Sequence, residues 1–238
     1  MALSSDCWMI LFENNGWWIN TMFAGFSGRY VPDSISELML TATINNVVFD
    51  PNSDDYGWLI LGDENERVTN DNLDVALFGA MDGLVNGNNT LKDVIIGPNN
   101  SQTWIVVCTD NAWVAQNIPT ELFDQMGQLV AAGDQLKTVV FNPEDSNGWL
   151  IICENNAWVV NGNFPSDTAQ KIADLIAGGL VLKDVVFMPG DKSAWMIICE
   201  NNGWYFSGNF NTDIVNQIGT LMPSGLVLRT VIFGPGPI

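Results

Sequence analysis

The sequence contains no histidine and little positive charge. Eight lysines and arginines stand against 27 aspartates and glutamates, which gives a formal net charge of −19 over 238 residues. A field of this sign repels phosphate backbones and anionic lipid surfaces, so we expect no nucleic-acid partner and no attraction to acidic membranes. The absence of histidine also removes the most common general base of enzymes.

Long apolar runs and paired cysteines are missing as well. No segment is long and apolar enough to cross a bilayer, and residues 1–15 lack the basic start, apolar stretch and cleavage site of a secretory signal. Three of the four cysteines, Cys108, Cys153 and Cys199, occupy one repeat position that Phe12 and Gly62 fill in other copies. Such a position is typical of core packing. We therefore expect reduced thiols, no membrane span and a cytoplasmic protein.

The chain does have a fivefold repeat. A tryptophan opens a short apolar run five times, and an asparagine follows seven residues later: Trp8 and Asn15, Trp58 and Asn65, Trp104 and Asn111, Trp149 and Asn156, Trp195 and Asn202. Successive tryptophans lie 45 to 50 residues apart, which indicates tandem copies of one supersecondary unit. We expect one domain, residues 1–238, with five repeats at approximately 4–53, 54–99, 100–145, 146–190 and 191–238.

The fourth copy shows the pattern of one unit. Residues 149–153 form an apolar run of strand length, a polar turn follows, and a second strand starts at Trp158, which predicts a β-hairpin. Pro165, Ser166 and Asp167 are typical of a helix start, with Ser166 as the cap. After an amphipathic helix, residues 180–187 form a third strand. The unit is therefore predicted to be ββαβ.

Five such units could form an open array or close into a ring. An open array usually carries atypical polar units at its ends. The first and last copies here keep the tryptophan, the asparagine and the apolar strands. Closure would also remove exposed sheet edges, so we expect an α+β fold, a closed five-fold pseudosymmetric propeller of ββαβ repeats.

On this architecture the chain resembles two kinds of protein. Five tandem ββαβ units resemble the pentein toroid, the ring shared by guanidine-modifying enzymes and by ribosome anti-association initiation factor six. The five tryptophan-rich copies also resemble five-bladed tachylectin-like propellers, whose blades are all-β. The resemblance implies a pentein-like ring, with a five-bladed β-propeller as the alternative.

Catalysis is not expected. The resemblance to pentein hydrolases and transferases would imply a cysteine nucleophile, a histidine base and carboxylates that hold a guanidinium group. This chain has no histidine, and its repeated cysteines lie in apolar strands, where a thiolate is disfavoured. It also lacks a phosphate-binding loop, a dinucleotide fingerprint, a nucleophile elbow and zinc-ligand spacing. We expect no enzyme activity, no cofactor and no metal.

The polar turn of the hairpin is the candidate binding site. A second tryptophan follows the repeated asparagine by two residues in four copies, and Arg67 replaces it in the second, which indicates a position that is not deeply buried. Carboxylates precede the asparagine by two residues in four copies. An aromatic face beside amide and carboxylate groups suits a sugar. The candidate ligand-binding residues are Glu13, Asn15, Trp17, Asn111, Trp113, Glu154, Asn156, Trp158, Glu200, Asn202 and Trp204.

The asparagines have a second explanation, since asparagine tolerates positive φ in turns. With the binding explanation, the chain is a non-catalytic, lectin-like protein whose weak sites hold a glycan or another polyvalent ligand through avidity. The alternative function is a scaffold that docks a macromolecule through one face of the ring, similar in role to the initiation factor. The sequence specifies no oligomeric state.

The few bases also follow the repeat. Four of the eight occupy one position of the third strand, where the first copy has Asn45: Lys92, Lys137, Lys183 and Arg229. One explanation is ion pairing with the hairpin acids or with Asp93 and Asp184. The alternative is a basic ring around a central channel that holds an anion.

Overall fold

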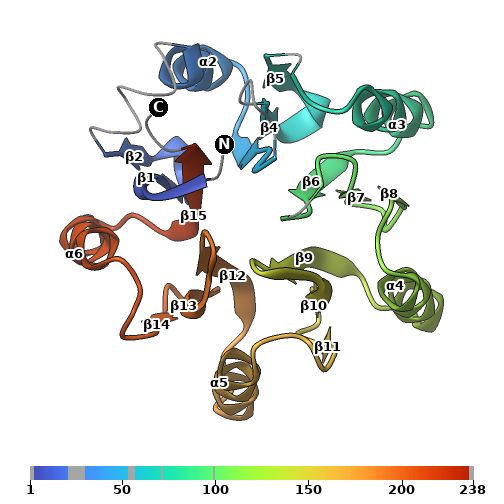
Figure 1. Cartoon of the computed structure of the whole chain (residues 1–238). Helices are drawn as coiled ribbons and strands as arrows, with labels where there is room; N and C mark the ends of the chain where they lie inside the picture. The colour runs from blue at the N-terminus through green and yellow to red at the C-terminus, as the bar shows by residue number, and fades with distance from the viewer. Residues whose placement is uncertain (1–2, 21–29, 53–56, 71, 99, 236–238) are drawn as a thin grey trace.

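The computed structural model describes residues 3–20, 30–52, 57–70, 72–98 and 100–235. These residues form five three-stranded antiparallel sheets and five α-helices (Figure 1). Each helix follows a hairpin and precedes a further strand, so the prediction of a repeated strand-rich unit with one helix is confirmed for the described residues.

The elements recur in one order. The first strands of the hairpins are β1 (Leu3–Phe12), β4 (Trp58–Gly62), β7 (Trp104–Cys108), β10 (Asp145–Cys153) and β13 (Asp191–Cys199). The second strands are β2 (Trp17–Ile19), β5 (Arg67–Thr69), β8 (Trp113–Gln116), β11 (Trp158–Val160) and β14 (Trp204–Phe206). The helices are α2 (Tyr30–Leu38), α3 (Val75–Asn86), α4 (Thr120–Ala132), α5 (Ser166–Ala177) and α6 (Thr212–Leu221). The third strands are β3 (Ile44–Phe49), β6 (Leu91–Ile96), β9 (Leu136–Asn142), β12 (Leu182–Met188) and β15 (Leu228–Pro235).

Each sheet combines two successive sequence repeats. The third strand of one repeat pairs with the first strand of the next, as in β9 with β10, where Phe141 lies opposite Trp149. The sheet orders are β3-β4-β5, β6-β7-β8, β9-β10-β11 and β12-β13-β14, and the fifth is β15-β1-β2. The C-terminal strand therefore pairs with the N-terminal one.

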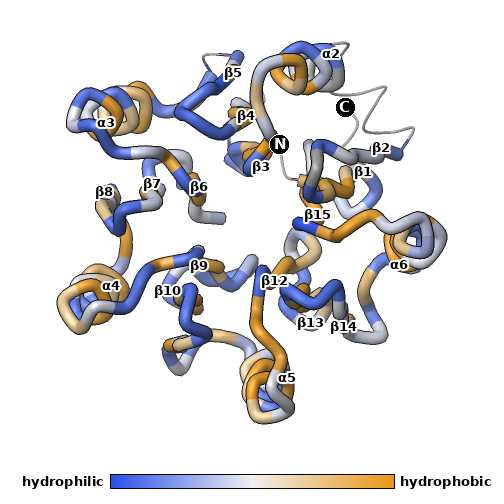
Figure 2. Tube along the Cα trace, turned by 180° about the vertical axis from the view of Figure 1, so that it is seen from behind, coloured by the Kyte–Doolittle hydropathy of each residue, from blue (hydrophilic) through white to orange (hydrophobic). Residues whose placement is uncertain are grey.

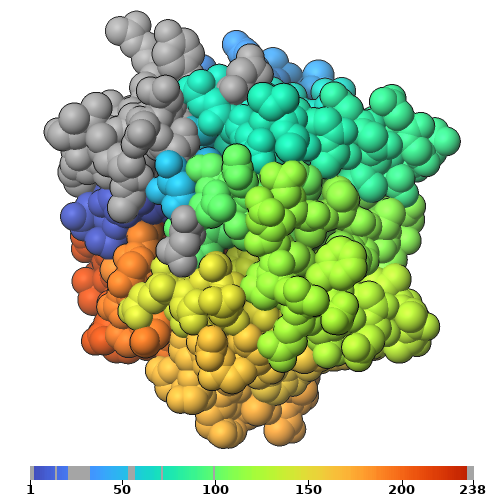
Figure 3. Space-filling view, turned by 45° about the vertical axis from the view of Figure 1, so that its right-hand side comes forward, coloured from blue at the N-terminus to red at the C-terminus, as the bar shows by residue number. Residues whose placement is uncertain are grey.

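The sheets lie around a common centre, and the helices lie outside (Figure 1). The third strands are the innermost, and each contacts the third strands of both neighbouring units, including β15 with β3. In the space-filling view the chain colours follow one another around the surface, unit beside unit (Figure 3). This arrangement brings side chains from five distant segments to one central place.

Five hydrophobic cores fill the spaces between neighbouring sheets. The middle strand of each sheet serves two cores because its side chains alternate: Trp149 and Ile151 of β10 face one core, whereas Leu150 and Ile152 face the next. The five opening tryptophans are between 1% and 7% exposed, as the sequence predicts. Hydrophobic and hydrophilic residues alternate around the helices, which turn their apolar sides to these cores (Figure 2).

One local prediction is wrong. Ser166 does not cap α5 but is its first residue, and Pro165 occupies the N-cap position without a side-chain hydrogen bond. The error is one residue, and the fixed φ of proline suits the start of a helix. Asn211, at the same place before α6, does cap its helix by accepting from the Asp213 N–H at 2.8 Å.

Candidate functional site

The repeated asparagines adopt a left-handed backbone conformation at the hairpin turns. Their φ angles are 60° at Asn15, 69° at Asn65, 73° at Asn111, 69° at Asn156 and 64° at Asn202. Asparagine accepts this region more readily than most residues. The turn geometry that the sequence allowed as an explanation is therefore present in every copy.

The side chains of these asparagines also join neighbouring sheets. Asn156 Nδ2 donates to the Leu180 carbonyl at 2.9 Å, and its Oδ1 accepts from the Leu182 N–H at 2.9 Å, at the start of β12. The other four turns repeat the bonds, to Ala42 and Ile44, Asn89 and Leu91, Asp134 and Leu136, and Leu226 and Leu228. We call these five residues the asparagine clamps. Both ends of each amide are thus engaged within the protein.

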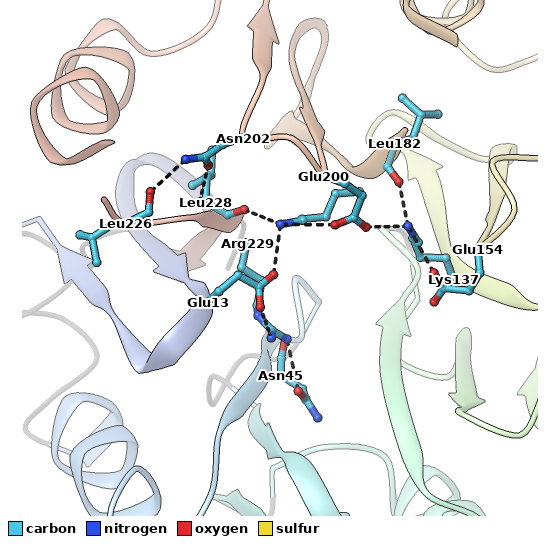
Figure 4. Close-up of polar contacts among 11 residues, drawn as sticks. Glu13, Asn45, Lys137, Glu154, Leu182, Glu200, Asn202, Leu226, Leu228 and Arg229 are labelled. Atoms are coloured by element: carbon cyan, nitrogen blue, oxygen red, sulfur yellow. Dashed lines mark hydrogen bonds and ion pairs between the residues drawn. The ribbon is translucent and has the colours of Figure 1, made fainter. Parts of the chain in front are cut away.

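Three glutamates of the hairpin turns, Glu13, Glu154 and Glu200, point toward the centre of the molecule, where they contact the bases of the third strands (Figure 4). We call them the hairpin glutamates. Oppositely charged residues alternate there in the order Lys92, Glu154, Lys137, Glu200, Lys183, Glu13 and Arg229. Within this ion-pair network, Lys137 Nζ lies 2.7 Å from Glu200 and 3.3 Å from Glu154. The predicted pairing of bases with hairpin acids is confirmed.

The network favours the ionised form of two of its acids, Glu13 and Glu154. Burial by itself would raise the pKa of Glu13, but Arg229 and Lys183 outweigh it, and the pKa lies below the ordinary value of a glutamate. The pKa of Glu154 is lowered against burial in the same way by its two lysines. Each lysine also bonds the next third strand, as Lys183 does by donating to the Leu228 carbonyl at 3.0 Å. The network therefore ties the inner strands together.

A cavity of about 870 Å³ lies at this network, lined by the third strands of all five units. On each third strand the residue that follows the base, or Asn45 in the first copy, is polar. These five residues form a polar layer of the lining: Asn46, Asp93, Thr138, Asp184 and Thr230. Valine, isoleucine, phenylalanine and proline residues make up most of the rest of the lining. The cavity thus has a charged end, a polar middle and an apolar part.

Two carboxylates of the polar layer have only neutral hydrogen-bond partners. Asp93 accepts from Asn46 Nδ2 and Thr138 Oγ1, both at 2.7 Å, and Asp184 accepts from Thr230 Oγ1 at 2.6 Å. Burial raises the pKa of Asp93 to about 6 despite these bonds, and the nearby charge of Asp184 adds to the rise. The bases pair with the hairpin glutamates and not with these two aspartates.

The second tryptophans are half-buried on the outer side of the sheets. Trp17, Trp113, Trp158 and Trp204 each pack at the edge of a core, so the expectation that this position is not deeply buried is confirmed. Two of them form aromatic pairs with exposed phenylalanines. Trp113 meets Phe123 of α4 edge-on at 4.8 Å between ring centres, and Trp204 stacks on Phe206 at 5.4 Å.

A third aromatic pair lies in a groove of about 520 Å³ between the β1–β2 hairpin and α6. Trp8 and Trp18 stack there at 4.9 Å with an interplanar angle of 28°. Asp213, Asn216 and Gln217 of α6 line the same groove, and none of these three side chains bonds another residue in the described part of the chain. We call this site the outer groove.

Sequence reasoning missed the outer groove. The search followed positions shared by the repeats, and Trp18 is a departure from them, because only the first copy has a tryptophan doublet. The structure also separates what the sequence grouped: clamp amides join sheets, carboxylates face the centre, and the second indoles lie at the outer cores.

The cysteines offer no reactive thiolate. All four are buried and unpaired, and burial raises the pKa of Cys7 to about 12 and that of Cys153 to about 11. Among the described residues no group of three cysteines, aspartates or glutamates is arranged to hold a metal ion.

Comparison of the chain with protein-family models, curated proteins and solved structures finds no match. In the described residues, no helix combines the length and the apolar character needed to span a membrane.

Proposed function

We propose that this chain is a non-catalytic, lectin-like protein that binds carbohydrate on the outer side of a closed, pentein-like ring. Two contacts support closure: β15 pairs with β1, and it also contacts β3. The five helices between the sheets favour the ββαβ type of ring over an all-β propeller.

The observation that carries the carbohydrate proposal is the outer groove. Trp18, which stacks on the buried Trp8, offers an apolar surface to the C–H side of a sugar ring. Asp213, Asn216 and Gln217 offer acceptors and donors for hydroxyl groups. These polar groups have no partner among the described residues, so binding a sugar breaks no internal bond there. This distinguishes them from the clamp amides.

Multivalency remains part of the proposal. The pairs of Trp113 with Phe123 and of Trp204 with Phe206 lie on two further units, and both phenylalanines are exposed, at 51% and 42%. Three aromatic sites on one rigid body suit a ligand with repeated sugars, because the second and third contacts form at high effective concentration.

The experiment is a glycan array with the whole chain, followed by calorimetry with the strongest oligosaccharide. Trp18→Ala combined with Asn216→Ala should weaken binding at least about tenfold, the size expected for losing one stacking face and one hydrogen bond. Trp158→Ala serves as the matched control, since within the described residues Trp158 packs at the edge of a core and forms no stacked or edge-on aromatic pair.

Two results would count against the proposal. If no glycan binds, and a pull-down instead retains one macromolecule per chain, the scaffold alternative is favoured. If glycans bind but the double variant retains full affinity and Trp158→Ala loses it, the site is the repeated hairpin and not the outer groove.

A further inference from the structure

The ion-pair network is broken between Arg229 and Lys92. Going round the centre, each of the hairpin glutamates Glu13, Glu154 and Glu200 lies between the bases of two successive third strands, as Glu154 does between Lys92 and Lys137. The fourth hairpin acid, Asp63, corresponds to the place between Arg229 and Asn45, and it accepts from the Thr43 N–H at 2.9 Å. By the same rotation, Thr109 takes the place between Asn45 and Lys92. At this place the repeat supplies neither the carboxylate nor one of the two bases.

Thr109 occupies the same backbone position as the glutamates. Its N–H donates to the Thr90 carbonyl at 2.9 Å, just as the Glu154 N–H donates to the Gln135 carbonyl at 2.8 Å. The two side chains therefore start from equivalent points, but the threonine ends before a carboxylate would begin. In the described part of the chain no hairpin carboxylate therefore reaches Lys92 from this side, and Glu154 is its one acidic partner.

The groups around this space are hydrogen-bond donors. Lys137 has two carboxylate neighbours, whereas Lys92 has one, and the Lys92 side chain is twice as exposed, at 20% against 10%. Asn45 Oδ1 accepts from Arg229 at 3.2 Å, and its amide nitrogen points away from that contact (Figure 4). The Nε of Arg229, on the far side of Asn45, is buried and has no partner among the described residues.

We propose that the carboxylate of a small organic acid binds at this break, in the place of the missing glutamate. Lys92 supplies the charge, the Asn45 amide supplies a further donor, and the rest of the molecule extends into the central cavity, which both residues line. Lys92 contacts one carboxylate where Lys137 contacts two, so one further carboxylate would complete its pairing. A doubly charged phosphate is disfavoured because the carboxyl groups of Asp93 and Asp184 line the same cavity.

The test uses the whole chain at pH 7 and sodium acetate as the probe, at constant ionic strength with sodium chloride. Saturation-transfer NMR on the acetate methyl group reports binding in the millimolar range, and thermal unfolding reports stabilisation. Acetamide is the neutral probe of the same shape, and sodium phosphate is the competing oxyanion. Acetate should show transfer and raise the melting temperature, and acetamide should do neither.

Thr109→Glu is the decisive variant because it supplies the missing carboxylate from the chain itself. It should fold, raise the melting temperature by about 2–4 °C, as one more ion pair would in a chain of this length, and abolish acetate transfer. Thr109→Gln has the same size without the charge, and should not raise the melting temperature. Lys92→Met should weaken acetate binding about tenfold.

Three results would overturn the proposal. Thr109→Glu could retain acetate transfer, which would place acetate elsewhere. Thr109→Gln could stabilise the chain as much as Thr109→Glu, which would make the gap a matter of space and not of charge. Phosphate or acetamide could bind better than acetate, which would exclude a carboxylate site.

Discussion

The asparagine clamps give the sharpest test of how the units are held together. Asn156→Gly removes the two bonds to Leu180 and Leu182 but keeps a residue that accepts a φ of 69°. Two neutral hydrogen bonds to partly buried backbone groups contribute about 2 kcal/mol together. Asn156→Ala loses the same bonds and adds about 1 kcal/mol of left-handed strain. The expected losses are therefore about 2 kcal/mol for glycine and about 3 kcal/mol for alanine.

The assay is reversible unfolding in guanidinium chloride, with thermal melting as a second measure. For a chain of this length, 2 kcal/mol corresponds to a fall of about 4–8 °C in the melting temperature. Asn155→Ala is the matched control, because Asn155 is exposed and its bonds, to the Asp134 carboxylate and the Ala157 N–H, do not reach the next third strand, so its loss should stay at about 0.5 kcal/mol. Asn202→Gly should match Asn156→Gly, since its two clamp bonds are 3.0 and 2.9 Å long.

Two outcomes would refute the clamp reasoning. If Asn156→Gly is as stable as the unmodified chain, the inter-sheet bonds contribute nothing net. If Asn156→Gly is the less stable of the two variants, the backbone conformation does not matter as argued. Below its melting temperature Asn156→Gly should also bind carbohydrate normally, because the clamp amide faces Leu180 and not solvent.

Three further predictions concern single buried groups. Asp93→Asn should stabilise the protein by about 1.4 kcal/mol more at pH 8 than at pH 5, measured by unfolding at both pH values. Burial raises the folded pKa of Asp93 to about 6, above the ordinary value of an aspartate, so stability is gained as pH falls through 6. Equal effects at both pH values would contradict this reasoning. Trp149→Phe should lower the free energy of unfolding by about 1 kcal/mol less than Trp104→Phe does. The reason is that Trp149 Nε1 has no hydrogen-bond partner among the described residues, whereas Trp104 Nε1 donates to Asp74 at 3.0 Å. Calorimetric unfolding measures the difference, and the reverse order would contradict the prediction. Iodoacetamide at pH 8 should leave all four thiols unmodified in the native protein and label all four in denaturant, because all four are buried. Burial raises the pKa of Cys7 to about 12, so rapid labelling of Cys7 in the native protein would contradict the prediction.

The local part of the fold could be predicted from the sequence because it depends on short spacing. Apolar runs of five residues, a polar turn and an asparagine at a fixed offset specify a hairpin, and the five hairpins form as expected. The pairing of the bases with hairpin acids could also be anticipated, since each recurs at one position in four of the five units and the two carry opposite charge. These features recur at the same offset in most or all copies.

The sheet partners could not be predicted in the same way. An antiparallel strand such as β9 presents the same apolar alternation to either neighbour, so its sequence does not distinguish its own hairpin from the hairpin of the next repeat. The sequence also does not specify to which side of the sheet each hairpin side chain points. Glu154 and Trp158 are four residues apart on one hairpin, yet one lines the central cavity and the other packs in an outer core.

The repeat also shows where function should be sought. The clamp asparagines are kept in all five copies, and each side-chain amide makes the same two internal hydrogen bonds. These amides are therefore already engaged and are poor candidates for ligand binding. Some departures are compensated: Arg67, in place of a second tryptophan, pairs with Asp82 of α3. Thr109 and Trp18 are not compensated, since one leaves a base with a single carboxylate and the other adds an indole beside unpaired polar groups. Because structure alone would favour the same residues here as in the neighbouring units, we propose that a ligand completes the bonding at these uncompensated departures.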